Sequence, residues 1–142
     1  MSTLALPMGQ PHVRKELRAS AAATSTGNTD RFQVSAFSAA DILLDVTAAS
    51  GTSPTLDVYI QKRLADSSTW QDIAHFAQNT GAAGKQILSF VSSGNSVAAV
   101  QTDALTVNTV KTTLIGAEWR VRWVIAGTSP SFSFSVAGDF FV

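Results

Sequence analysis

The strongest pattern of hydrophobic and polar positions lies near the end of the chain, over residues 118–136. Before a break, apolar side chains occupy every second position, namely Trp119, Val121, Trp123 and Ile125. After it, Phe132, Phe134 and Val136 alternate with serines. The break is Gly-Thr-Ser-Pro, in which glycine permits unusual dihedrals and proline removes a backbone donor. Because a period of two sorts side chains onto opposite strand faces, the stretch predicts an amphipathic β-hairpin.

A second copy of this pattern occurs earlier in the chain. Residues 50–60 read SGTSPTLDVYI and residues 126–136 read AGTSPSFSFSV, so both have apolar residues two, four and six positions after the proline. Each copy also follows an apolar strand, which in the first copy covers residues 41–46. Either the two segments converged on a convenient turn, or two hairpins occupy related places in a two-layered β-fold.

Shorter alternating segments occur through the rest of residues 28–142. The predicted strands cover residues 31–37, 41–46, 55–63, 70–76, 87–91, 97–101, 105–111, 119–125 and 132–136. In one of them, the side chains expected to point inward are Leu56, Val58 and Ile60, and those expected to point outward are Asp57, Tyr59 and Gln61. Irregular spacing near Asp72 predicts a bulge or a strand end. The pattern predicts an all-β domain over residues 28–142, a jelly roll or β-sandwich of about eight strands.

The first 27 residues are predicted to form an extended N-terminal arm. Pro7 and Pro11 hinder regular structure, and residues 19–27 are mostly Ala, Ser and Thr. A short helix over residues 13–23 is a weaker interpretation. Such an arm is either a disordered tail or a segment that becomes ordered on a partner surface. Its candidate partner-binding residues are apolar anchors and a basic cluster, namely Leu4, Leu6, Met8, Val13, Arg14, Lys15, Leu17 and Arg18.

Composition narrows the class of protein. Only 14% of the 142 residues are charged, well below the usual quarter, which suggests either an exterior covered by neighbours or a hydroxyl-rich stand-alone β-protein. The net charge of zero gives no overall attraction to nucleic acid. The absence of cysteine excludes disulfides and thiolate metal sites. Without a secretory signal or an apolar run of roughly 20 residues, we expect a soluble protein with no membrane contact, made in a cytoplasm.

Residues suited to catalysis are sparse. His12 and His75 are not part of any zinc or triad motif, and His75 is expected at the surface or at a strand end. Asp41 and Asp45 share a strand face but lie roughly 13 Å apart, so a glycosidase would need a carboxylate from another strand. The sequence predicts no catalytic residue, no cofactor and no metal.

Two binding chemistries are also conceivable. Arg120 and Arg122 share a strand face, but ion pairs with neighbouring strands or subunits explain them better than nucleic-acid binding does. Trp70, Trp119 and Trp123 could form a sugar-binding platform, although their alternation with polar residues favours the core.

Three segments resemble small structural proteins of tailed-bacteriophage virions. They are SGTSPTLDVYIQ at residues 50–61, STWQDIAHF at residues 68–76 and WRVRWVIAGTSPSFSFSV at residues 119–136. The resemblance covers about residues 41–136, and it implies a jelly-roll or β-sandwich module that coats or reinforces a capsid. Capsid decoration proteins of this type commonly sit as trimers on the shell and hold neighbours with N-terminal arms. The shared motif is a fold signature and transfers no catalytic residue.

We therefore expect a non-enzymatic capsid decoration protein on the virion surface, with the major capsid protein and copies of itself as partners. The N-terminal arm would clamp neighbouring subunits. A tail or baseplate protein of the same virion class is one alternative, because such modules recur in both places. A carbohydrate-binding β-sandwich is the alternative from another class.

Overall fold

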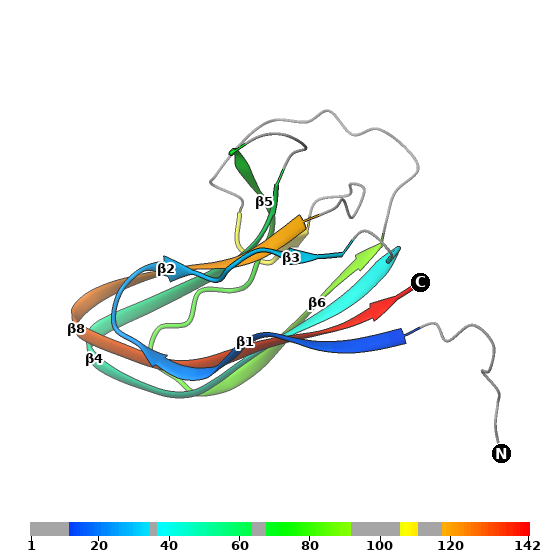
Figure 1. The fold of residues 1–142 in the computed structure, drawn as a ribbon. Coiled ribbons are helices and arrows are strands. Elements are labelled where there is room, and N and C mark those ends of the chain that lie inside the picture. Colours follow the sequence, from blue (N-terminus) through cyan, green and yellow to red (C-terminus); the bar gives the residue numbers. More distant parts are fainter. Residues whose placement is uncertain (1–11, 35–36, 64–67, 92–105, 111–117) are drawn as a thin grey trace, which may run out of the picture.

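Two long strands organise the molecule, β4 (Ala39–Arg63) and β8 (Glu118–Phe141), which run antiparallel to each other along their whole length. The computed structural model describes residues 12–34, 37–63, 68–91, 106–110 and 118–142. Both long strands bend near their middle, so the ribbon that they form folds over itself into two layers (Figure 1). The shorter strands are β1 (His12–Ala23), β2 (Gly27–Asn28), β3 (Phe32–Gln33), β5 (Trp70–His75), β6 (Gly84–Val91) and β7 (Thr109–Val110).

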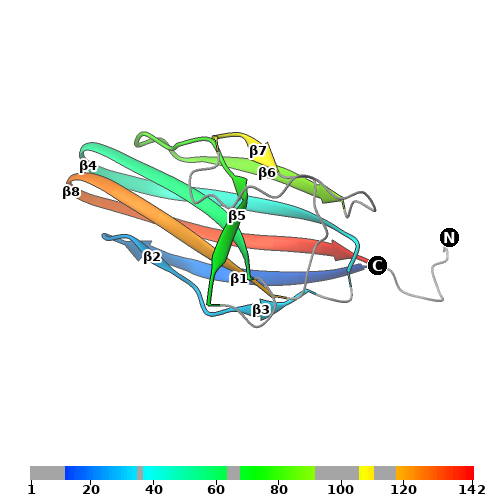
Figure 2. The same cartoon turned by 90° about the horizontal axis from the view of Figure 1, so that it is seen from above.

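The shorter strands extend this ribbon on both sides in each layer (Figure 2). We call the first layer the one with the order β6, first half of β4, second half of β8, and β1. The second layer has the order β7, β5, second half of β4, first half of β8, and then β2 and β3. The predicted all-β sandwich is confirmed, and the described part of the chain contains no helix.

The two Gly-Thr-Ser-Pro segments meet at the bend, where Thr52 pairs with Thr128. Their backbones match, since φ is +113° at Gly51 and +120° at Gly127. A Cβ on Gly51 would lie 2.8 Å from the Ser129 carbonyl oxygen, and a Cβ on Gly127 would lie 2.8 Å from the Ser53 carbonyl oxygen. Each glycine therefore makes room for the other segment's backbone, and the repeat marks one shared bend.

The hairpin predicted over residues 118–136 is wrong. The two halves of β8 pair with β4 and lie in opposite layers. They contact each other through side chains instead, with the Trp123 and Phe134 rings 5.7 Å apart and the Trp119 and Phe140 rings 5.8 Å apart. A hairpin and a continuous strand with a bend both show strict alternation interrupted by a turn signal. Only the pairing of both halves of β8 with β4 distinguishes the bent strand from the hairpin.

The hydrophobic core lies between the two layers. Inward side chains of the first layer include Ile42, Leu44, Val46, Phe132, Phe134 and Val136, and those of the second include Leu56, Val58, Ile60, Ile73, Trp119 and Val121. The inward positions predicted in the strand over residues 55–63 are thus confirmed. Gln61 was expected to point outward to solvent but is buried, because Asp72 and Arg120 cover it. The predicted bulge near Asp72 is confirmed, since Ile73 is the extra residue between two β4–β5 pairs.

Of the other predicted strands, the one over residues 105–111 is represented by β7 in its described part, and the one over residues 31–37 by β3. The strand predicted over residues 97–101 lies outside the described residues.

The arm predicted over residues 1–27 is wrong from His12 onward, and so is the domain boundary at residue 28. Residues 12–23 form β1, which pairs with β8 from Phe141 to Phe132, and Leu17 enters the core. The weaker helix interpretation is wrong for the same reason. Hydroxyl residues also stabilise the segment that follows β1. On either side of β2, the hydroxyls of Thr26 and Thr29 accept hydrogen bonds from the β8 amides of Ile125 and Val121.

Candidate interaction surfaces

The predicted partner-binding residues fall into two groups. Leu4, Leu6 and Met8 lie outside the described residues. The five others belong to β1, where Leu17 is in the core and Val13 is 47% exposed at the sheet edge. These five residues were expected to contact a partner as parts of a free arm, and the structure assigns most of them contacts within the sandwich.

The basic residues of β1 all bind groups of this chain. Arg14 makes a bidentate ion pair with Asp139, at 3.0 and 3.1 Å. Lys15 lies 5.6 Å from the centre of the Phe32 ring. The Arg18 guanidinium stacks on the Phe134 ring at 3.8 Å and on the Trp123 ring at 4.7 Å, and it donates a hydrogen bond to the Phe134 carbonyl. These contacts fasten the edge strand to the sandwich.

Burial accounts for the altered acidity of Arg18. Its guanidinium is partly withdrawn from water between the two rings, and this desolvation lowers its pKa from the ordinary value. Cation–π attraction between the guanidinium and the two rings offsets part of the free-energy cost of this desolvation. Arg18 therefore packs on Trp123 and Phe134 within the sandwich rather than presenting a free charge to a partner.

The outer face of the first layer is a surface of regular strand formed by β6, β4, β8 and β1. Three rows cross it, each made of directly paired residues on neighbouring strands. The first row is Ser89, Asp41, Asp139 and Arg14; the second is Ile87, Leu43, Ala137 and Glu16; the third is Lys85, Asp45 and Ser135. An apolar row thus lies between two polar ones, and hydroxyl side chains such as Thr47 and Ser133 continue the face toward the bend.

A shallow hollow of about 150 Å³ opens on this face. Leu43, Ile87 and Ala137 form its apolar part, while Asp41, Asp139 and Arg14 form its polar rim. Ile87 is 65% exposed, an unusual state for an isoleucine in the middle of a strand. Ile87 shares an apolar row with Leu43 and Ala137, and all three line the depression.

Two carboxylates oppose each other on the rim of the hollow. Asp41 and Asp139 are direct partners on neighbouring strands, a placement that disfavours two like charges. The hydrogen bond from Arg14 lowers the pKa of Asp139 from its ordinary value, with a smaller contribution from His12, while burial acts in the opposite direction. Asp41 accepts a 2.5 Å hydrogen bond from Ser89 and has no cationic partner within the described residues. The rim therefore carries negative charge that this part of the chain leaves unneutralised.

This carboxylate pair is the kind that a glycosidase would need from two strands. A general acid in such a pair requires a raised pKa, which burial in an apolar site provides. The pKa of Asp139 is lowered instead, because Arg14 stabilises its ionised form. Asp139 is thus suited to attracting a cation and unsuited to donating a proton.

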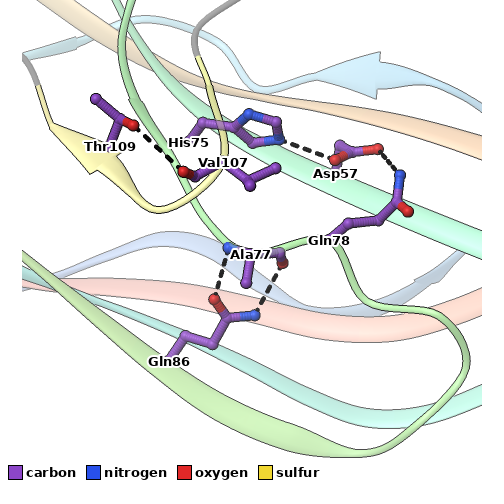
Figure 3. A network of polar contacts seen from close by, with 7 residues as sticks. All are labelled: Asp57, His75, Ala77, Gln78, Gln86, Val107 and Thr109. Carbon is purple, nitrogen blue, oxygen red and sulfur yellow. Dashed lines mark hydrogen bonds and ion pairs between the residues drawn. The ribbon is translucent and has the colours of Figure 1, made fainter.

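A second polar cluster joins β4, β5 and β6 (Figure 3). The His75 Nε2 lies 2.8 Å from Asp57 Oδ1, and Gln78 donates a 2.8 Å hydrogen bond to the other Asp57 oxygen. The Gln86 amide makes two hydrogen bonds with the backbone of Ala77, at 2.8 and 3.0 Å. These bonds fix the crossover from β5 in the second layer to β6 in the first.

His75 lies at a strand end, one of the two positions expected for it. It is the last residue of β5, as expected for a strand end, but it is buried rather than at the surface. The Tyr59 ring stacks on it at 4.0 Å, and burial followed by the charges of Asp57 and Asp72 raises the pKa of Tyr59. Sequence reasoning missed the His75–Asp57 pair because the two residues are 18 positions apart; the register of β4 and β5 brings them together.

The tryptophans do not offer a sugar-binding platform. Trp119 is fully buried, Trp123 is covered on one face by Arg18, and Arg120 stacks on Trp70 at 4.4 Å. Arg120 also donates a 2.7 Å hydrogen bond to Gln61, and Arg122 lies 5.8 Å from the centre of the Tyr59 ring. The arginines of β8 thus contact aromatic rings as well as polar groups, where ion pairs alone had been expected.

Among the described residues, no group of three or more His, Cys, Asp or Glu side chains is arranged to hold a metal ion. None of the described segments is a helix long and apolar enough to cross a membrane. Comparison with protein-family models, with curated proteins and with solved structures finds no match to this chain.

Proposed function

We propose that this protein is a non-enzymatic structural component of a tailed-bacteriophage virion, which binds the outer surface of the capsid and stabilises it. The observation that carries the proposal is the outer face of the first layer. It combines regular antiparallel strands, small hydroxyl side chains, an exposed Ile87 and a rim of charged side chains with an excess of carboxylates. Such a face suits contact with another protein surface better than capture of a small molecule.

The strand order supports the same proposal. We infer a jelly-roll winding from the layer orders, because β4 and β8 form a folded-over antiparallel ribbon that β1 and β6 flank in the first layer and β2, β3 and β5 flank in the second. Jelly rolls recur in viral capsid and lectin domains. The lectin alternative, a carbohydrate-binding sandwich, lacks a supporting observation, since the three tryptophans have their faces covered.

We propose the major capsid protein and copies of this chain, as a homotrimer on the shell, as the partners. The arm in this proposal is reduced to residues 1–11, with Leu4, Leu6 and Met8 as its anchors. Fully extended, eleven residues reach at most roughly 40 Å, enough to contact an adjacent subunit. The protein would be made in the host cytoplasm and would act on the virion.

Co-sedimentation tests this function directly. The purified full chain is mixed separately with empty heads and with isolated tails from the phage that encodes it, and each mixture is centrifuged. The proposal predicts saturable recovery of the protein with heads and none with tails. Recovery with tails alone would favour the tail or baseplate alternative, and recovery with neither would reject a virion surface as the partner.

A further inference from the structure

We infer that the hollow on the outer face of the first layer is the docking point for the shell, and that it receives an aliphatic side chain lying next to a lysine or arginine. This inference rests on the proposed function, because it names the chemistry of the partner surface. Three features of the hollow lead to it, and they concern size, polarity and charge.

The size of the hollow fits one side chain. Its volume is about 150 Å³, comparable to that of apolar cavities that accommodate a benzene-sized group. Leu43 and Ile87 are direct partners across β4 and β6, and Ala137 continues the same row on β8. The small side chain of Ala137 leaves the depression open, so an aliphatic side chain from a partner would cover Ile87 and remove apolar surface from water.

The rim selects the charge of the partner. The face carries four carboxylates, on Glu16, Asp41, Asp45 and Asp139, and two permanent cations, on Arg14 and Lys85, which gives a net charge of −2. Lys85 stands opposite Asp45 in the strand register, and Arg14 forms an ion pair with Asp139. Asp41 is left without a cation within the described residues, and it lies directly on the rim.

A cation from the partner would complete this row. A lysine or arginine next to the inserted aliphatic side chain would approach Asp41 from outside and relieve its repulsion with Asp139. An acidic partner would meet two carboxylates instead. Charge complementarity therefore favours a basic partner surface at the hollow. The attraction between this surface and the rim should weaken as the salt concentration rises.

The chemistry is tested with blocked dipeptides and the amide spectrum of the isotope-labelled full chain. N-acetyl-Leu-Arg amide is titrated against N-acetyl-Leu-Glu amide and N-acetyl-Gly-Arg amide. We expect shifts at residues 41, 43, 87 and 137, with the Leu-Arg peptide binding about threefold more tightly than Leu-Glu, as one exposed ion pair allows. Equal binding of Leu-Arg and Leu-Glu, or shifts located elsewhere, would overturn the inference.

Matched variants separate the hollow from the rest of the face. Asp41→Asn keeps the acceptor for Ser89 and removes one charge, whereas Asp45→Asn removes one charge on the same strand outside the hollow. The Leu-Arg preference should disappear in Asp41→Asn and persist in Asp45→Asn. Ile87→Ser, at an exposed position, should weaken all peptides without unfolding the chain. Loss of the preference in Asp45→Asn to the same extent would contradict a role for this rim.

Head binding then distinguishes the two proposals. If Asp41→Asn and Ile87→Ser lower recovery with heads severalfold while Asp45→Asn does not, both proposals hold. Undiminished head binding by both hollow variants would reject the hollow as the docking point and leave the capsid function standing. Specific Leu-Arg binding with no head binding by the native chain would reject the capsid function and with it this assignment of the partner. Loss of self-association in place of head binding would assign the hollow to a second copy of the chain.

Discussion

At the scale of single residues, Trp119 shows how the sandwich is held together. It comes from the second layer, is fully buried and contacts Phe90 and Phe140 of the first layer. Trp119→Ala should therefore lower the free energy of unfolding by about 3–5 kcal/mol. Val142→Ala, at a side chain that is 72% exposed, should change it by less than about 0.5 kcal/mol. Urea denaturation measures both, and equal effects would contradict the assigned core.

Asp139 provides the pH-dependent prediction at the same scale. Its pKa in the folded protein is lowered, chiefly by the hydrogen bond from Arg14, so the ionised carboxylate stabilises the fold. That stabilisation is fully present above the unfolded pKa, near 3.8, and is lost as pH falls through the lower folded value. Asp139→Asn should lower the unfolding midpoint at pH 7 and lose this difference at acidic pH. A difference that is constant with pH would reject the ion pair as its cause.

At the scale of elements, the shared bend depends on its two glycines. In Gly51→Ala the new Cβ would lie within 3 Å of the backbone of the other segment, at a φ that side chains rarely adopt. We expect a loss of at least about 1–3 kcal/mol of stability for this variant and similarly for Gly127→Ala. Because the two sites contact each other, their effects in a double variant should not add. Gly84→Ala is the matched control, since nothing lies within 4 Å of the position that its new Cβ would take.

The edge strand β1 gives a second prediction at this scale. Deleting residues 1–24 removes Leu17 from the core and Arg18 from the Trp123 and Phe134 rings. This deletion should destabilise the sandwich by at least about 2 kcal/mol. Deleting residues 1–11 leaves these contacts in place, so it should destabilise the sandwich less than the longer deletion does, while weakening capsid binding or trimer cohesion. Equal unfolding transitions for the two deletions would contradict the pairing of β1 with β8.

These elements also show what the sequence can predict. Strict alternation identified the strands around Leu56 and Phe134, because each has one face in the core. It could not show that the Gly-Thr-Ser-Pro segments form one bend, since pairing between residues 76 positions apart (127 − 51 = 76) leaves no local signal. It missed β1 because backbone hydrogen bonds hold that edge and Leu17 is the one residue of β1 that is buried in the core. The hollow was missed because Asp41, Ile87 and Asp139 come together only through register.

At the scale of the whole molecule, a folded antiparallel ribbon carries an outer face of regular strands. The bend fixes the two layers against each other, and the core leaves the first layer's outer face free for a partner. Rigid surfaces lose little conformational freedom on binding, which favours a stable coat made of many copies. A protein of this design would strengthen a shell by adding contacts between its subunits.

Imaging of heads incubated with the full chain tests the proposed capsid function most directly. Cryo-electron microscopy should show added density on the outer capsid surface, in threefold clusters, with the layer that contains β1 and β6 facing the shell. Native heads without added protein, and heads incubated with Ile87→Ser below saturation, are the comparisons. Heads that show no added density at saturating protein would contradict the proposed function. Density with the second layer facing the shell would contradict the assigned docking face.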